Sequence, residues 1–141
     1  ARGADCDAEF YVNDAGNLIV RPTLGEAQSV DVKDVVDELV AKKVSLPILI
    51  RFPQLLASQV RSISESFARA IAEYGYQNVY TPVFPVKVNQ QKHFIDEVVE
   101  FGAPWRLGLE AGSKPELLIA LSAEQEAEAA HPGQLRHGPG E

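Results

Sequence analysis

The stretch VYTPVFPVKVNQQKHFIDEVVEF, residues 79–101, contains the pattern that decides the fold. Its first part, residues 79–88, is a nearly continuous apolar run, which is typical of a strand buried on both faces. Its second part, residues 90–101, has apolar residues at helical spacing and is followed by Gly102, a residue type that favours the end of a helix. A strand followed by a helix is the repeating unit of an α/β protein.

Two similar units flank this one in the sequence. Upstream, LPILIRF at residues 46–52 predicts another buried strand, and the long helix after it should end at Gly75. Downstream, residues 105–110 predict a third strand, and Ser113 is expected to cap a third helix, with Glu116 closing a capping box. Three such units with short links predict parallel strands and α/β architecture, whereas a closed barrel requires eight units.

The two ends of the chain differ from this repeat. Residues 10–22 predict a hairpin around the turn signal at residues 13–17, and residues 31–43 predict a helix. SAEQEAEAA can extend the third helix, whereas the last eleven residues, rich in Gly, Pro and His, predict disorder. We therefore expect an N-terminal segment with hairpin and helix at residues 1–45, the strand–helix units at 46–121, and a divergent, disordered tail at 122–141.

The composition excludes several classes of function. The net charge of -7 argues against a nucleic-acid binder or an anionic-membrane binder, since both need basic patches. No apolar run approaches the roughly 20 residues that a membrane helix needs. Cys6 is the only cysteine, which suits a reducing compartment, and we expect a cytoplasmic location. The isolated histidines predict no metal site, and the absence of methionine indicates a processed, recombinant or partial chain.

Lys87 is the residue in the central strand that invites a chemical explanation. If residues 79–89 form a strand, Lys87 shares a face with Val83 and Pro85 near the carboxyl end of the strand. Sites in α/β proteins lie at that end, and a lysine partly desolvated there is easier to deprotonate, so that its amine is available for a Schiff base. Alternatively, the strand ends near Val86 and Lys87 simply reaches water, which is the interpretation that periodicity alone favours.

Two further candidates follow the third strand. Glu110 ends that strand, and the pattern leaves open whether its carboxylate faces Lys87 or only terminates the strand. Gly112 and Ser113 lead into a helix N-terminus, which is able to hold an anion, although an ordinary cap is the simpler interpretation. His93 has no nucleophile at a recognisable spacing and is expected on the surface.

Several segments together resemble the N-terminal part of biosynthetic arginine decarboxylase. They are YVNDAGNLIVRP, RFPQLL, VRSISESFARAIAEYGY, PVKVNQQ and EFGAPWRLGLEAGSKPELLIAL. The resemblance runs from about Phe10 to Leu121 and covers a small fraction of a full family member. It implies a pyridoxal-phosphate-dependent enzyme of the alanine-racemase-like fold group. We therefore expect a partial (β/α)8 TIM barrel of three units, preceded by the short hairpin.

The resemblance also implies roles for individual residues. Lys87 corresponds to the catalytic lysine that binds pyridoxal phosphate covalently. Glu110 and Ser113 fall in an acidic-small-small-Ser pattern near the cofactor, so the resemblance implies that they bind it too. It further implies a carboxy-lyase that converts L-arginine to agmatine and carbon dioxide in polyamine and spermidine biosynthesis, typically with Mg2+, and that is homo-oligomeric at full length.

Three hypotheses about this chain remain open. It is a fragment of an arginine decarboxylase, a truncated non-catalytic product, or a fragment of another member of the fold group, such as diaminopimelate decarboxylase or a pyridoxal-phosphate-binding regulatory protein. In the family the glycine-rich phosphate-binding segments and the acidic partner of the ring nitrogen lie in later sequence, so we expect the chain alone to be inactive. The strand edges of an incomplete barrel predict marginal stability and aggregation.

Overall fold

The structure is a computed structural model that describes residues 10–22 and 28–130. It separates into two compact units, residues 1–58 and residues 59–141, which are described one at a time. The domain boundary expected after residue 45 stays a prediction. Cys6 and the disordered tail expected after residue 130 lie outside the described residues.

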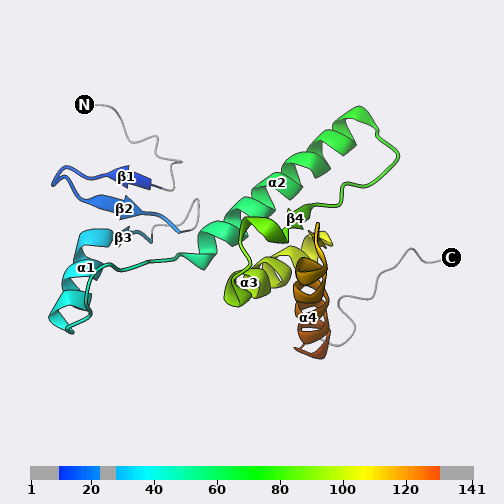
Figure 1. The fold of residues 1–141 in the computed structure, drawn as a ribbon. Coiled ribbons are helices and arrows are strands. Elements are labelled where there is room, and N and C mark those ends of the chain that lie inside the picture. The colour runs from blue at the N-terminus through cyan, green and yellow to red at the C-terminus, as the bar shows by residue number, and fades with distance from the viewer. Residues whose placement is uncertain (1–9, 23–27, 131–141) are drawn as a thin grey trace. The chain divides into compact units, whose positions relative to one another are not determined.

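The first unit combines a small antiparallel sheet with one helix (Figure 1). The central strand β2 pairs with β1 on one side and with β3 on the other, and Ile19 and Val20 of β2 are buried. Helix α1 follows β3 directly and contacts β2 and β3. The hairpin and the helix expected here are therefore confirmed. The bounds are β1 Phe10–Val12, β2 Leu18–Val20, β3 Val30–Asp31 and α1 Val32–Ala41.

Side-chain hydrogen bonds fix the hairpin turn and tie it to α1. The Oδ1 atom of Asn13 accepts from the backbone amides of Ala15 and Asn17, at 3.0 and 2.9 Å. Nδ2 of Asn17 donates to Oδ2 of Asp31 at 2.8 Å. Oδ1 of Asp31 accepts from the Lys33 amide at 2.9 Å, so that Asp31 is the N-cap of α1. One carboxylate thus joins the turn to the start of the helix.

This carboxylate predicts an acid-sensitive first unit. The hydrogen bonds from the Asn17 side chain and the Lys33 amide lower the pKa of Asp31 below its ordinary value. Because the folded pKa lies below the unfolded one, the stabilisation is fully present above the unfolded value and is lost as the pH falls through the folded value. We expect the protection factors of the β2 amides, which correct the exchange rates for the intrinsic pH dependence of amide exchange, to fall as the pH drops below the ordinary aspartate pKa of 3.8. Asp31→Asn should remove this pH dependence, and an equally steep acid response in that variant would contradict the assignment.

The second unit contains a parallel pair of strands and three helices (Figure 1). Strands β4 and β5 pair in register, with Val83 opposite Gly108 and Pro85 opposite Glu110. Helices α3 and α4 lie side by side and contact each other. The bounds are α2 Pro53–Tyr74, β4 Val83–Pro85, the 3₁₀ turn η1 Val86–Val88, α3 Lys92–Gly102, the 3₁₀ turn η2 Ala103–Trp105, β5 Gly108–Glu110 and α4 Lys114–Ala130. Helix α2 begins before residue 59 and continues into this unit.

The core of the second unit lies between α3, α4 and the turn η1. Its buried members are Val86, Ile95, Val99, Ala120 and Ala123. Phe84 and Leu109, from the two paired strands, are partly buried and pack against this core. The turn that carries Lys87 is therefore anchored by its first residue, Val86.

The two valines that flank Lys87 provide a matched pair of stability tests. Val86 is fully buried, whereas Val88 is 67% exposed. Val86→Ala removes two buried carbon atoms and leaves a small cavity, so we expect a loss of about 2 kcal/mol in the free energy of unfolding. Val88→Ala should change it by less than about 0.5 kcal/mol. Urea denaturation followed by circular dichroism measures both, and equal losses in the two variants would contradict the burial described here.

The strand expected at residues 46–52 is absent, and that expectation was wrong. The structure places no strand there, and the side chains of Leu46 and Leu49 are exposed. A strand needs a neighbour with which to form backbone hydrogen bonds, and in the described part of the chain β4 has β5 as its partner. An apolar run alone does not supply that neighbour. The observed architecture is mixed α/β, with two strand–helix units in place of the three expected.

Helix α2 agrees with the expected helix and its stop signal. Gly75 has φ +61°, the left-handed conformation that favours glycine, and the Tyr76 amide donates to the Ile71 carbonyl at 3.0 Å. The apolar stripe of this helix is only partly covered, because Ile63 and Phe67 remain about half exposed. The Phe67 ring stacks on Tyr80 with a centroid separation of 3.8 Å.

Helix α4 extends farther than the boundary expected at residue 122. It is helical through Ala130, which corrects the expectation of disorder for residues 122–130 and confirms that SAEQEAEAA extends the helix. Lys92 of α3 forms ion pairs with Asp96 of its own helix and with Glu126 of α4. These exposed pairs join the extension to α3 but contribute little stability, since solvent screens them.

Candidate active site

Lys87 lies in the 3₁₀ turn η1, immediately after β4 ends at Pro85. The alternation expected along residues 79–89 was therefore wrong beyond Pro85, because Val86 and Val88, expected on one face, are buried and exposed respectively. A 3₁₀ turn has about three residues per turn, so successive side chains do not alternate between two faces. The Lys87 side chain is exposed, which confirms the alternative that the strand ends near Val86 and that Lys87 reaches water. The partial burial of its amine, which the other alternative required, is not present in this chain.

Glu110 lies at the same end of the sheet as Lys87. It is the last residue of β5 and is opposite Pro85, two residues before Lys87. The parallel pairing thus brings the carboxyl ends of both strands to one edge of the sheet. Lys87, which follows β4, and Glu110, which ends β5, both lie at that edge. Both side chains are exposed.

Lys87 differs from most other lysines in the described part of the chain. Lys33, Lys42 and Lys92 each form an ion pair with a carboxylate. Within the described residues, the Lys87 amine has neither a hydrogen bond nor an ion pair, and this is also true of Lys43 and Lys114. The Lys87 amine is therefore accessible to a small molecule.

Ser113 caps α4, and its partner Glu116 lies in the first turn of that helix. The Ser113 hydroxyl accepts from the Glu116 amide at 3.4 Å, a long contact. Oε2 of Glu116 accepts from the Gly112 amide at 2.8 Å, one residue earlier than the capping box predicts. Ser113 is therefore the cap of α4 in this structure, while a role for Ser113 in binding a cofactor stays a prediction.

Other features of the described residues lie away from Lys87. A groove of about 300 Å³ between α3 and α4 is lined by residues that include Ile95 and Ile119, and a second of about 270 Å³ includes Trp105 and Ser64. Neither groove is lined by Lys87.

Across residues 10–22 and 28–130, no three His, Cys, Asp or Glu side chains are grouped to hold a metal ion. Nor does any helix in those ranges have the length and apolar character to cross a bilayer.

Comparison with known proteins finds biosynthetic arginine decarboxylases. No family model matches the chain. The chain is 48% identical over 113 residues to the biosynthetic arginine decarboxylase of Thermosynechococcus vestitus, and 47% identical over 113 residues to biosynthetic arginine decarboxylase 2 of Synechocystis sp.. The chain is therefore similar to one segment of the biosynthetic arginine decarboxylases. The match covers 80% of this chain but only 18% and 17% of those two decarboxylases.

A solved arginine decarboxylase shares the fold of this segment. The crystal structure of the biosynthetic arginine decarboxylase SpeA from Campylobacter jejuni superposes with a TM-score of 0.72 at 34% sequence identity. The superposition covers 82% of this chain and 19% of the SpeA chain. The resemblance drawn from the quoted segments is thus confirmed, and the mixed α/β fold is that of one segment of an arginine decarboxylase.

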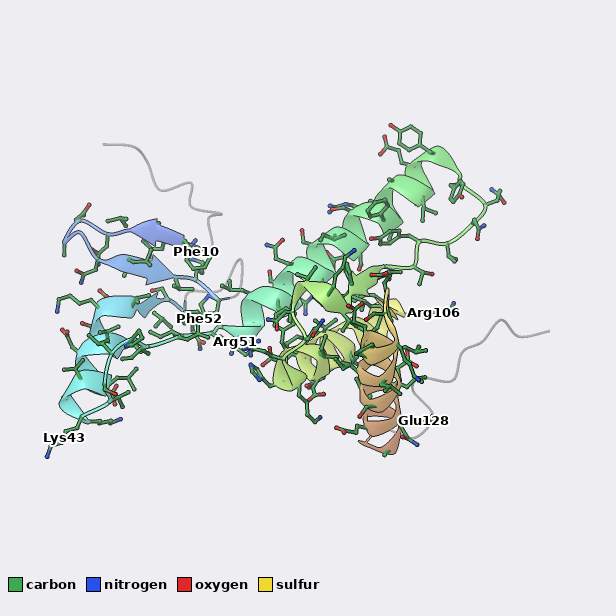
Figure 2. All side chains as sticks on the ribbon, in the orientation of Figure 1. Phe10, Lys43, Arg51, Phe52, Arg106 and Glu128 are labelled. Carbon is green, nitrogen blue, oxygen red and sulfur yellow. The ribbon has the colours of Figure 1, made fainter. Side chains whose placement is uncertain are left out.

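Sequence reasoning left open where the strand before Lys87 ends and did not predict the 3₁₀ turn. Pro82 and Pro85 within the apolar run were the available signal, because proline cannot donate to a strand ladder and so argues for a short strand. The contact between Gly112 and Glu116 differs from the expected one by a single residue. Arg106, at the turn between η2 and β5 (Figure 2), has φ +55°, and nothing in its sequence neighbourhood indicates this left-handed conformation.

Proposed function

We propose that this chain is the segment of a pyridoxal-phosphate-dependent arginine decarboxylase that supplies the cofactor-binding lysine, Lys87. The parallel pairing of β4 and β5 carries this proposal, since it brings Lys87 and Glu110 to the same carboxyl edge. Ligand sites of α/β proteins lie at such edges. We also propose that the two strand–helix units belong to a larger (β/α)8 barrel completed by the remaining four-fifths of a family member.

The described residues suit the aldehyde of pyridoxal phosphate but offer no evident site for its phosphate. An accessible primary amine without a competing carboxylate suits the aldehyde of pyridoxal phosphate. A phosphate site is not evident at the α4 N-terminus, because Glu116 already occupies the Gly112 amide. The phosphate site is therefore expected outside the described segment. The described residues also supply no group of three ligands for Mg2+, so we derive no step through that ion.

The chemistry expected of Lys87 and Glu110 follows from their positions. When bound, pyridoxal phosphate accepts the electrons released as the carboxylate of arginine leaves as carbon dioxide. Lys87 would hold the cofactor at the sheet edge through its amine, and that amine would be released when the amine of arginine takes its place. Glu110, on the adjacent strand end, would orient a positive or hydrogen-bonding group of the bound molecules, because its exposed carboxylate accepts hydrogen bonds.

Borohydride trapping tests the proposal on the chain as it stands. The purified chain is incubated with pyridoxal phosphate, reduced and mapped by mass spectrometry. We expect one dominant adduct on Lys87, which is lost in Lys87→Ala without moving to another lysine. Lys43→Ala is the matched control, because Lys43 is also an exposed lysine with no carboxylate partner among the described residues (Figure 2).

The opposite result would support the non-catalytic hypothesis. Scattered labelling over the other lysines would mean that the segment has no formed cofactor site. Those lysines are Lys33, Lys42, Lys43, Lys92 and Lys114. The exposed leucines of α4 favour an incomplete fold, which predicts that the chain alone does not make agmatine. The homo-oligomeric state and cytoplasmic location expected of the full-length enzyme stay predictions.

A further inference from the structure

The N-terminus of α4 is closed by a residue of its own first turn. Glu116 donates its amide to the Ser113 hydroxyl at 3.4 Å, and its Oε2 atom accepts from the Gly112 amide at 2.8 Å. Free amides at a helix N-terminus are the groups that bind phosphates. The Gly112 amide is not free, since a carboxylate of the protein already takes the place that a phosphate oxygen would occupy.

A second carboxylate lies against the same glycine. A Cβ atom placed on Gly112 would lie 3.5 Å from Oε1 of Glu110 and 3.6 Å from Oε2 of Glu116. Two negative groups therefore flank Gly112. Their repulsion opposes the binding of a phosphate at this helix end, although the helix dipole alone would favour it.

The first turns of α4 are also connected to the turn that carries Lys87. Helix α4 contacts η1, and Ala120 of α4 packs in the same core as Val86. On the other side, β5 is held to β4 by the pairing of Glu110 with Pro85. The short segment from Glu110 to Ser113 joins these two fixed elements, and the hydrogen bond to Glu116 restricts it.

We propose that Glu116 is a positioning residue, which holds the Glu110 turn beside Lys87 and closes the α4 N-terminus to phosphate. This inference rests on the proposed function for its reference to Lys87. Glu116 occupies the Gly112 amide, so the cofactor is oriented at this edge of the sheet through Lys87 and Glu110. The phosphate group is held by a different part of the protein.

Titration with inorganic phosphate tests the closure without the cofactor. Backbone amide resonances of Gly112 and Ser113 are followed by NMR in the chain and in its Glu116→Ala and Glu116→Gln variants. We expect no saturable shift in the parent chain and a saturable shift in Glu116→Ala, which frees the Gly112 amide and removes a negative charge. Glu116→Gln keeps an acceptor for that amide and should stay closer to the parent. Saturable shifts in the parent chain, or none in Glu116→Ala, would overturn the inference.

Cofactor trapping tests the positioning role. Glu116→Ala should lower the share of pyridoxal phosphate adducts on Lys87 by about fivefold, because the turn loses a charge-assisted hydrogen bond. Glu116→Gln should restore most of that share. Glu124→Gly, at an exposed site farther along α4, weakens the helix without touching Gly112, because glycine is a poor helix former, and should leave the labelling unchanged.

The phosphate titration and the trapping experiment distinguish a failure of this inference from a failure of the proposed function. If the parent chain shows no preference for Lys87, the proposed cofactor role fails in this chain, and the phosphate titration still decides whether Glu116 closes the helix end. If the parent labels Lys87 and Glu116→Ala labels it equally well, the cofactor role stands and the positioning role of Glu116 is overturned. An equal loss in Glu124→Gly would likewise overturn it, since general weakening of α4 would then explain the effect.

Discussion

Replacing Lys87 with alanine is expected to lower kcat by on the order of 10³-fold or more in an active hybrid arginine decarboxylase. The hybrid carries residues 10–121 of this chain in place of the matching segment of the Thermosynechococcus vestitus enzyme, with which the match is 48% identical. The reason for a large loss is that the amine of Lys87 is the group proposed to hold the cofactor, and alanine has no amine to replace it. Agmatine formation from arginine at saturating substrate measures the effect.

Two control variants make the result specific. Lys43→Ala removes an exposed lysine of the first unit and should leave kcat unchanged. Lys87→Arg keeps the positive charge but replaces the primary amine with a guanidinium, which stays protonated and is a poor nucleophile, so it should be as inactive as Lys87→Ala. Activity retained in Lys87→Arg would show that charge, and not the amine, is what the site needs.

Replacing Gly102 with alanine is expected to lower the free energy of unfolding of the second unit by about 3 kcal/mol. Gly102 is buried at the end of α3, and a Cβ atom there would lie 2.6 Å from Cβ of Leu107 and 3.1 Å from its Cγ. The Leu107 Cβ is fixed to the backbone, and the Leu107 amide donates to the Gly102 carbonyl at 3.1 Å. The clash therefore cannot be relieved by rotating the end of a flexible side chain, and the α3–β5 connection has to move.

Gly108→Ala is the matched control for this prediction. Gly108 lies one residue beyond Leu107, and a Cβ atom there would meet nothing within 4 Å. Its free energy of unfolding should change by less than about 0.5 kcal/mol. Urea denaturation followed by far-ultraviolet circular dichroism compares the two, and a chain of marginal stability would lose its folding transition altogether in Gly102→Ala. Similar midpoints for both alanine variants would contradict the close approach.

The helices of this protein were predictable because their signals are local. Apolar spacing predicted α1, α2 and α3, and Gly75 marked the end of α2 through its own conformational freedom. The strands were less predictable, because a strand depends on a partner elsewhere in the chain. Residues 46–52 have the composition of a buried strand, yet the structure has no strand there.

The candidate site was predictable in its residues and not in its geometry. The segments around Lys87 and Glu110 resembled a known family closely enough to name both residues, and β4–β5 pairing brings them to one edge. The exposure of Lys87 agrees with the alternative that periodicity favoured, in which the strand ends near Val86, whereas the 3₁₀ turn and the packing of Val86 in the core depend on tertiary contacts that no local pattern encodes. Similarly, the proximity of Leu107 to Gly102 arises from tertiary packing that no local pattern encodes.

Because residues 86–88 form a 3₁₀ turn, the direction of the Lys87 side chain depends on the number of residues between Pro85 and Lys87. Each residue of such a turn rotates the next side chain by about 120° around its axis, whereas a strand would rotate it by half a turn. An insertion of one residue between Pro85 and Lys87 would therefore swing the amine sideways along the sheet edge, and an insertion of three would return it to its original heading. The direction of the Lys87 side chain is therefore preserved only when the number of residues added before it corresponds to whole turns of the 3₁₀ helix.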